Sequence, residues 1–351
     1  MNILFIPHVP NLTVINRVYE FSKVTNSYFL YWEIDNSSFK QKILSQIKSL
    51  SKKREGKRVQ IPLLFKPEGL SVKFNTFNLN RLIDELKIDK VVNANALLFD
   101  IEQIKVPVTY DLVDDHLEVN SDIGLNEKRV AKIKKDIKHS KGVVAVTSIL
   151  EQKVKILNNN TITIENGLYL DRFKEAKSLK KELGLEGKKV FGFIGGIEEW
   201  TGLEEAIKNY LKIKDTHTAF LVVGGNNGSY YKNLVKNYSD EVLFVGSVHP
   251  KNVADYFKSI DIGLIPFKLN DFTNNAYPIK ALEYGLAGAN VLSTPLTVLK
   301  EKKLPFIKFC EIDEFYHSMS VISRRDSLFD FSNLSWKKQA EKLLNFVERL
   351  V

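Results

Sequence analysis

A lysine and a glutamate stand three residues apart late in the chain, where their side chains could bind an anion and a pair of hydroxyl groups. They are Lys280 and Glu283, and they follow Pro278, which suits the first turn of a helix. Residues at i and i+3 share nearly one helix face. The lysine adds positive charge, and the carboxylate is a two-oxygen acceptor that matches vicinal hydroxyls such as those of a ribose. An ion pair on a solvated helix face would explain the same spacing.

The helix that carries this pair is expected over 278–287, because Gly288 suits its C-terminal end. A loop over 267–277 joins it to an apolar run, and at such a junction free backbone N–H groups and the helix dipole favour an anion. Lys280 lies in the first turn, where a cation is unfavourable for the helix itself. We therefore expect a ligand or an acidic neighbour to offset its charge.

Glycine turns follow three other apolar runs in the same half of the chain. Their glycines are Gly195, Gly196, Gly224 and Gly246. A glycine at the end of a strand lets a diphosphate approach the backbone closely, although tight turning alone would also explain each one. Three such turns, together with the helix over 278–287, predict a nucleotide site.

Short apolar runs that alternate with helix-like stretches would position these motifs. The expected strands are 2–6, 90–93, 106–110, 142–147, 190–194, 219–223, 242–245, 260–266 and 290–293. Most are β-branched and apolar on both faces, which is typical of a parallel sheet covered by helices. The spacing leaves room for a helix after each strand. The sequence therefore predicts an α/β fold with two doubly wound Rossmann-like domains facing a cleft.

The chain length of 351 residues suits two domains, and a turn-rich, charged stretch separates the two groups of strands. The expected divisions are an N-terminal domain over 1–170, a linker over 171–188, a second domain over 189–333 and a C-terminal helix over 334–351. Apolar residues recur at helical spacing along the last of these segments.

The charge balance and the single cysteine narrow the class of protein. The formal net charge of +9 suits polyanionic partners such as nucleic acid, anionic lipid or nucleotide-linked substrates. No nucleic-acid motif is recognised, so no nucleic acid is expected. One cysteine excludes an intramolecular disulfide and fits a reducing compartment. The N-terminus is unlike a signal peptide and no apolar run approaches the roughly 20 residues of a spanning helix, so we expect a cytoplasmic protein.

Residues 39–58 are strongly basic and also carry an apolar stripe. The stripe comprises Phe39, Ile43, Leu44, Ile47 and Leu50, with lysines around it. This pattern resembles an interfacial helix that binds anionic lipid. A core-packed helix with a solvated face is the alternative. On the first interpretation the protein binds peripherally to the inner face of the cell membrane.

The segment "IPFKLNDFTNNAYPIKALEYGLAGANVLSTP" resembles the donor-binding segment of glycosyltransferases with two Rossmann-like domains, the GT-B fold, near family 4. "SKGVVAVTSILEQKV" resembles the end of that family's first domain, and "IENGLYLDRF" resembles its hinge. "FGFIGGIEEW" resembles the first strand and turn of its donor domain, and "SWKKQAEKLL" its closing helix, which packs back on the first domain. "VPVTYDLVDDH" resembles a subgroup with an Asp-rich strand end. The likeness covers most of 85–350.

By this resemblance, Glu283 would bind the donor ribose, and Gly195 and Gly196 would line the diphosphate. Asn275 stands where the family usually has a second Glu, which touches the donor sugar. We therefore count Asn275 among the catalytic candidates.

The chain departs from the family in its basic residues near the diphosphate. The family's usual Arg and Lys after the glycine turn are missing, and Gly196 and Thr201 stand in their places. Lys280, with the helix N-terminus, is the candidate that would meet the phosphate charge instead. Members of this fold generally need no metal for the diphosphate, so neither a metal nor a cofactor is expected.

Polar residues in the first half suit the acceptor side of such an enzyme. Asp111 follows an expected strand and could position a sugar hydroxyl or act as a base. Asp114 is a second catalytic candidate, although with Asp115 it could equally cap the next helix. His8 and Asn95 also follow expected strands and are candidates to contact the acceptor.

The resemblance implies a glycosyltransferase that moves a sugar from a nucleotide sugar to a glycan or lipid-linked acceptor, with retention at the anomeric carbon. Polysaccharide or glycoconjugate biosynthesis is the expected context. Two alternatives stay open: a nucleotide-sugar epimerase on the same frame, which would need no acceptor, and a non-catalytic protein that binds the nucleotide sugar. Fold alone does not separate them.

Overall fold

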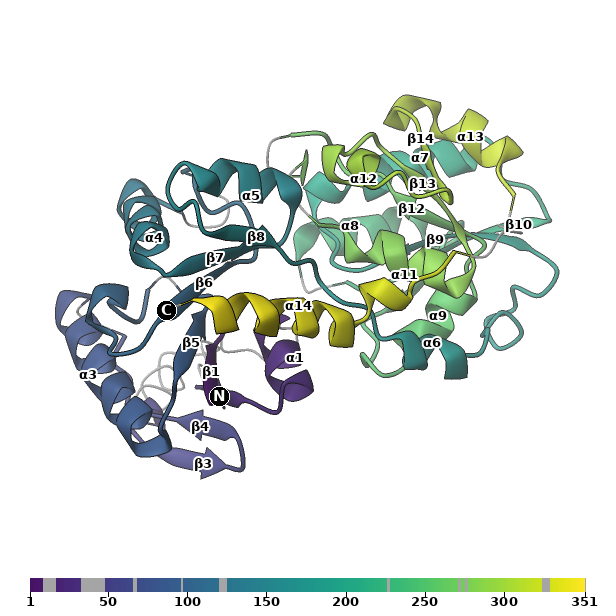
Figure 1. Cartoon of the computed structure of the whole chain (residues 1–351). Helices are drawn as coiled ribbons and strands as arrows, with labels where there is room; N and C mark the ends of the chain where they lie inside the picture. Colours follow the sequence, from purple (N-terminus) through teal and green to yellow (C-terminus); the bar gives the residue numbers. More distant parts are fainter. Residues whose placement is uncertain are drawn as a thin grey trace. The chain divides into compact units, whose positions relative to one another are not determined.

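The chain forms two compact α/β units in a computed structural model, which describes residues 1–8, 17–32, 48–65, 68–95, 97–119, 125–225, 228–270, 273–274, 277–323 and 329–350 (Figure 1). Unit 1 comprises residues 1–167 together with the helix α14 (Trp336–Arg349), and unit 2 comprises Leu168–Ser335. Each unit has a sheet of mainly parallel strands with helices in the connections. The prediction of two doubly wound Rossmann-like domains is confirmed.

Unit 1 is built on an 8-stranded sheet in the order β3-β4-β2-β1-β5-β6-β7-β8. The strands are β1 (Ile3–Ile6), β2 (Tyr28–Leu30), β3 (Lys53–Glu55), β4 (Arg58–Gln60), β5 (Lys90–Asn93), β6 (Val108–Leu112), β7 (Gly142–Ala145) and β8 (Thr161–Thr163). The helices are α1 (Arg17–Val24), α3 (Glu68–Leu86), α4 (Glu127–His139) and α5 (Ser148–Lys155), with a 3-10 turn η1 (Ile101–Gln103). Neighbouring strands run parallel except β3 and β4. The direction of strand order reverses at β1, between β2 and β5.

Unit 2 has a 6-stranded parallel sheet in the order β11-β10-β9-β12-β13-β14. The strands are β9 (Lys189–Ile194), β10 (Thr218–Val223), β11 (Leu243–Gly246), β12 (Ile262–Ile265), β13 (Asn290–Ser293) and β14 (Ile307–Phe309). The helices are α6 (Leu170–Glu175), α7 (Leu203–Leu211), α8 (Ser229–Tyr238), α9 (Val253–Lys258), α11 (Ile279–Ala287), α12 (Thr297–Lys302) and α13 (Phe315–Val321), and η2 (Glu199–Thr201) precedes α7. Strand order reverses between β9 and β12, which is where ligands bind in open α/β sheets.

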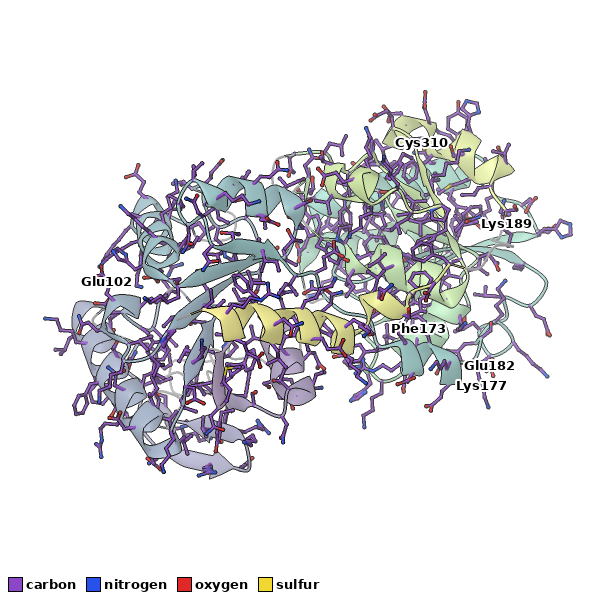
Figure 2. All side chains as sticks on the ribbon, viewed as in Figure 1. Glu102, Phe173, Lys177, Glu182, Lys189 and Cys310 are labelled. Atoms are coloured by element: carbon purple, nitrogen blue, oxygen red, sulfur yellow. The ribbon has the colours of Figure 1, made fainter. Side chains whose placement is uncertain are left out.

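Aromatic side chains fill the core of unit 2. Phe191 and Phe193 on β9 are fully buried, because this central strand is covered by helices on both faces. Phe173 of α6 lies in the segment predicted as a linker and is labelled in Figure 2. It packs on Phe257 of α9 with ring centroids 5.8 Å apart. Helix α6 therefore belongs to the packed body of unit 2.

The C-terminal helix α14 lies beside α1 in unit 1 (Figure 1). Trp336 meets Phe21 edge to face, with ring centroids 5.4 Å apart. At the other end, the Lys90 ammonium donates to the carbonyl oxygens of Val347, at 3.0 Å, and of Leu350. A cation on these last carbonyls stabilises the C-terminal end of a helix.

Two predictions about unit 1 are corrected. The strand expected over 106–110 is β6, Val108–Leu112, so Asp111 lies within the strand and not after it. Pro107 has no N–H to offer a neighbouring strand and stands before the first residue of β6. The helix predicted over 39–58 is wrong for its second half, because β3 and β4 pair as a hairpin around Gly56, whose φ is 62°. Residues 39–47 lie outside the described ranges. Within those ranges, no helix is both long and apolar enough to cross a bilayer.

Candidate functional site

Helix α11 forms as the sequence predicts and is fastened to the central strand of unit 2. It runs from Ile279 to Ala287, and Gly288 ends it in the left-handed conformation with φ 87°. The buried hydroxyl of Tyr284 donates to the Gly192 carbonyl at 3.0 Å and accepts from the Ile194 N–H at 2.9 Å. One side chain thus holds α11 against the end of β9. Its neighbour Glu283 is thereby held close to that strand end.

The ammonium group of Lys280 lies against the glycine turn that follows β9. It sits over the ring of Phe193 at 4.4 Å and over that of Phe267 at 5.2 Å. A Cβ atom on Gly195 would stand 2.5 Å from the lysine Nζ, and Gly195 has φ +136°. The positive φ favours glycine at this position, and the lysine Nζ occupies the space beside it. The structure therefore brings Lys280 and Gly195 together at the point where strand order reverses.

Lys280 and Glu283 are both partly buried, and among the described residues neither side chain has a hydrogen-bond or ion-pair partner. Burial lowers the pKa of Lys280 to about 8, against the opposing charge of Glu283. Burial likewise raises the pKa of Glu283 to about 7, opposed by Lys280 and by Arg172. The simple ion pair on a solvated face is therefore wrong. Two partly buried ionisable groups with pKa values shifted toward neutrality mark a candidate binding site.

The three predicted glycine turns lie side by side at the ends of β9, β10 and β11. The Gly195 N–H donates to the Val223 carbonyl at 3.0 Å, and the Gly224 N–H donates to that of Gly246 at 2.8 Å. A Cβ atom on Gly224, whose φ is +122°, would stand 2.0 Å from the Gly195 carbonyl oxygen. A Cβ atom on Gly196 would have no neighbouring atom within 4 Å. The backbone at Gly196 is therefore open to close approach by a ligand.

Arg172 belongs to this site and was missed at the level of the sequence. It lies on α6, in the hinge-like segment "IENGLYLDRF", and its guanidinium stacks on the Tyr169 ring at 3.5 Å. Its charge acts on Glu283. In the sequence, the signal for Arg172 is its place in the turn-rich segment "IENGLYLDRF".

The other donor-side positions are less informative. Asn275 lies outside the described residues. Thr201 is buried, and its hydroxyl donates to the Glu198 carbonyl at 2.6 Å, so it supplies no charge in place of the missing basic residue. Among the described residues, Lys280 and Arg172 place positive charge near Glu283.

Asp111 in unit 1 is not free to act as a base or to hold a sugar. It is buried, and both of its oxygens accept from Arg17 Nε, at 3.0 and 3.1 Å. Arg17 also donates to the Ile164 carbonyl and, at 3.3 Å, to the Asn166 side chain. Burial raises the pKa of Asp111, and Arg17 opposes this shift. Asp111 lies within the sheet because β6 continues through residue 112. Its contact with Arg17 gives the carboxylate a structural role.

Asp114 is the carboxyl group that remains available near the end of β6. Burial, and then the neighbouring Asp115, raise its pKa to about 6. The capping interpretation is wrong, because Asn126 caps α4 and Asp115 pairs with Lys153 at 2.6 Å. A carboxyl group with this pKa can exchange a proton near neutral pH.

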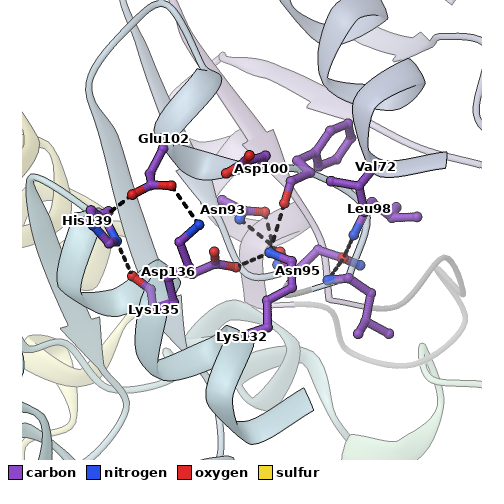
Figure 3. A network of polar contacts seen from close by, with 12 residues as sticks. Val72, Asn93, Asn95, Leu98, Asp100, Glu102, Lys132, Lys135, Asp136 and His139 are labelled. Carbon is purple, nitrogen blue, oxygen red and sulfur yellow. Dashed lines mark hydrogen bonds and ion pairs between the residues drawn. The ribbon is translucent and has the colours of Figure 1, made fainter. Parts of the chain in front are cut away.

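His8 and Asn95 follow β1 and β5, where strand order reverses in unit 1. The Asn95 amide donates to the His8 carbonyl at 3.2 Å. Its oxygen accepts from the N–H groups of Leu97 and Leu98 at 2.8 and 3.0 Å, and Figure 3 labels Asn95 and Leu98. Asn95 therefore holds the loop in place. His8 is different: its Nδ1 is buried without a partner among the described residues, and burial lowers its pKa.

Comparisons with known proteins agree with this geometry. Residues 188–315 match the family described as "Glycosyl transferases group 1", which covers β9 to the start of α13. A candidate teichuronic acid biosynthesis glycosyltransferase, TuaH, of Bacillus subtilis (strain 168) is 28% identical over 45% of this chain and 40% of its own length. An uncharacterized glycosyltransferase of Methanocaldococcus jannaschii is 26% identical over 49% of this chain and 44% of its own. The matched region thus spans less than half of these curated relatives.

Solved structures share the whole fold. The crystal structure of Anabaena HepE in complex with UDP aligns over 100% of this chain and 96% of its own, with a TM-score of 0.68 and 14% identity. Sucrose-phosphate synthase from Thermosynechococcus elongatus aligns over 100% and 95%, with a TM-score of 0.68 and 12% identity. The fold is therefore that of two-domain glycosyltransferases, and the resemblance to group 1 members is confirmed.

Proposed function

We propose that this chain, which has the GT-B fold and matches the group 1 glycosyltransferases through its second unit, transfers a sugar from a nucleotide-sugar donor to an acceptor. One observation carries the proposal: Lys280, Glu283 and the turn at Gly195 converge at the switch point of the unit 2 sheet, inside the segment that matches the family. The matches are to glycosyltransferases, and neither the epimerase nor the non-catalytic alternative is favoured by them.

In this proposal the Lys280 ammonium faces the diphosphate of the donor. Negative charge grows on the diphosphate as the bond to the sugar breaks, and a cation in a partly buried site stabilises that charge more than it would in water. Binding of the anion would raise the pKa of Lys280 again, since the charged form gains a partner. Lys280 thus takes the place of the basic pair that is absent at Gly196 and Thr201.

Glu283 would accept hydrogen bonds from the two ribose hydroxyls in its ionised form. Arg172 and Lys280 favour that form. We propose retention at the anomeric carbon, independence of a metal ion, and a glycan or lipid-linked acceptor, on the strength of the family resemblance.

A screen of nucleotide sugars tests the proposal. Because HepE was solved with UDP, UDP-glucose, UDP-galactose and UDP-N-acetylglucosamine are tested first, followed by GDP- and ADP-sugars. The readout is release of nucleoside diphosphate with and without cell-envelope extract as a source of acceptors. We expect one donor class to be used, with release increased by acceptor. Conversion of the free nucleotide sugar to its epimer, or nucleotide binding with no turnover in any mixture, would contradict the proposal.

A further inference from the structure

Unit 1 contains a cavity of about 580 Å³ at the carboxyl ends of its strands. His8 follows β1, Trp32 follows β2, Leu64 follows β4 and Asn95 follows β5, and all four residues line it. The first turns of α3 and α4 close the sides. The cavity thus stands where strand order reverses in this sheet, which is where a doubly wound domain binds its ligand.

The inner lining is mostly apolar. Trp32 and Leu98 are buried, at 3% and 6% exposed, and Phe65 and Val72 extend the same surface. Leu97 keeps 47% of its surface exposed although it lines the cavity. An apolar wall of this extent favours a hydrocarbon chain or ring, because burying it against these side chains removes apolar surface from water.

The lining also contains a set of basic residues, called here the basic rim. The basic lining residues are Lys73, Lys128, Arg129 and Lys132, and the acidic one is Asp100. Lys132 is held in position, since it donates to the Phe99 carbonyl at 2.9 Å and to Asp136 at 2.7 Å (Figure 3). Asp100 accepts from the Gln103 side chain at 2.8 Å. Lys73 and Lys128 are exposed to solvent, so a ligand can reach them. The excess of cations complements a phosphate or carboxylate group.

We infer that this cavity binds an anionic amphiphile, with its phosphate or carboxylate group at the basic rim and its apolar part against Trp32, Val72 and Leu98. This inference rests on the proposed function in one respect: the amphiphile is the acceptor, or carries it. A neutral glycan would not complement the net positive charge of the lining. A free inorganic anion would not complement the apolar wall.

The outer face of α3 indicates that the amphiphile comes from a membrane. Leu70 and Phe77 stand seven residues apart on this helix, on nearly the same face, and are 64% and 60% exposed. The guanidinium of Arg81 lies 6.0 Å from the Phe77 ring centroid. Leu70 lies between Gly69 and Ser71, which line the cavity. An exposed apolar pair with a basic neighbour, next to residues that line the cavity, fits a bilayer surface.

Calorimetric titration with dodecyl phosphate, kept below its micelle concentration, tests the cavity. Inorganic phosphate and the uncharged dodecyl maltoside are the comparison ligands. We expect dodecyl phosphate to bind at least tenfold more tightly than either. The variant Lys73→Ala/Lys128→Ala should bind dodecyl phosphate about tenfold more weakly, because it loses two partly solvated charge contacts. Leu97→Ser should bind dodecyl phosphate a few-fold more weakly, because it loses part of the apolar wall.

Matched controls lie on exposed surface outside the cavity. Lys134→Ala/Lys138→Ala removes two exposed lysines from α4, and Ile156→Ser replaces a side chain that is 87% exposed. Both controls should bind dodecyl phosphate like the wild type, and thermal melts should show every variant folded. Equal affinity for dodecyl maltoside, or a cavity variant that binds like its control, would overturn the inference.

Vesicles distinguish a lipid source from a soluble one. Wild-type protein should sediment with vesicles that contain phosphatidic acid, and Leu70→Ser/Phe77→Ser should not, while this variant still binds dodecyl phosphate. If the variant sediments like the wild type, the membrane source is wrong. UDP binding is measured in parallel without amphiphile. UDP binding without dodecyl phosphate binding overturns this inference alone, whereas the reverse result supports the cavity ligand and overturns the proposed function.

Discussion

The ammonium of Lys280 lies 4.4 Å from the centre of the Phe193 ring, directly over the glycine turn at Gly195. The ring face attracts the cation but gives it no hydrogen bond, so the three N–H donors of the lysine stay available to a ligand. A cation held in this way, in surroundings that lower its pKa to about 8, gains more from an arriving diphosphate than an exposed lysine would.

Lys280→Ala should therefore weaken binding of UDP roughly 10- to 100-fold and leave binding of uridine nearly unchanged, because a hydrogen bond to a charged group contributes about 1.5–3 kcal/mol. Calorimetry with both ligands measures the difference. Lys300→Ala, on the exposed side of α12, is the control. An equal loss for UDP and uridine would point to a defect in folding and not to a phosphate contact.

The affinity for UDP-glucose should pass through a maximum between about pH 7 and about pH 8. Below that range Glu283, with a pKa of about 7, becomes protonated and can no longer accept from both ribose hydroxyls. Above it Lys280, with a pKa of about 8, loses its charge. UDP-glucose keeps its own diphosphate charge across this range, so titrations at several pH values report the protein groups. Glu283→Gln should remove the acidic limb, and Lys280→Ala the alkaline limb.

Glu283→Gln should also impair donor use at any pH, because the amide replaces an acceptor oxygen by a donor. Turnover at several donor concentrations measures the effect, and Glu182→Gln, an exposed change in the same unit, is the control. Wild-type turnover and affinity in Glu283→Gln would exclude the ribose contact.

Tyr284→Phe should destabilise unit 2 by about 1–3 kcal/mol, because the Gly192 carbonyl and the Ile194 N–H would each lose a buried partner. Chemical denaturation measures the change, with Tyr256→Phe on α9 as the control. Since the same contacts hold α11 at the end of β9, UDP affinity should fall as well. A variant as stable as the wild type would mean that water replaces the hydroxyl.

Asp111→Asn should destabilise unit 1 by about 3–5 kcal/mol, because Arg17 would be left as a buried charge without its partner. Replacing both, as Arg17→Met/Asp111→Leu, should recover much of this loss. The activity per folded molecule should stay within a few-fold of the wild type in both variants. A drop of several orders of magnitude in folded Asp111→Asn would restore the catalytic role that the burial of Asp111 argues against.

The membrane contact predicted for residues 39–58 is tested through the β3–β4 hairpin. Lys53→Glu/Lys57→Glu reverses two exposed charges and should reduce sedimentation with anionic vesicles at low salt. Wild-type binding should weaken as salt rises, because the Debye length falls to roughly 3 Å at 1 M. Lys134→Glu/Lys138→Glu changes the net charge equally and should bind as the wild type does. If both pairs behave alike, net charge and not this hairpin governs the contact.

The sequence by itself determined the features that depend on neighbours along the chain. Pro278 and Gly288 bound α11 because capping involves only the residues at a helix end. The i and i+3 spacing put Lys280 and Glu283 on one side of that helix. Continuous apolar runs marked the buried strands, since a parallel sheet covered by helices has no polar face. The two-domain fold followed from their alternation with helices.

Only the tertiary structure decided which distant groups meet. Asp111 is followed by a plausible site motif in the sequence, yet its partner Arg17 lies 94 residues away. Arg17 is on α1 and reaches β6 because α1 packs against the sheet. The contacts of Lys280 with Gly195 and of Tyr284 with Gly192 likewise depend on how α11 packs across β9 and β12. The cavity in unit 1 is assembled from the ends of four strands and two helices. Local patterns encode the elements, whereas strand order and packing decide which side chains share a site.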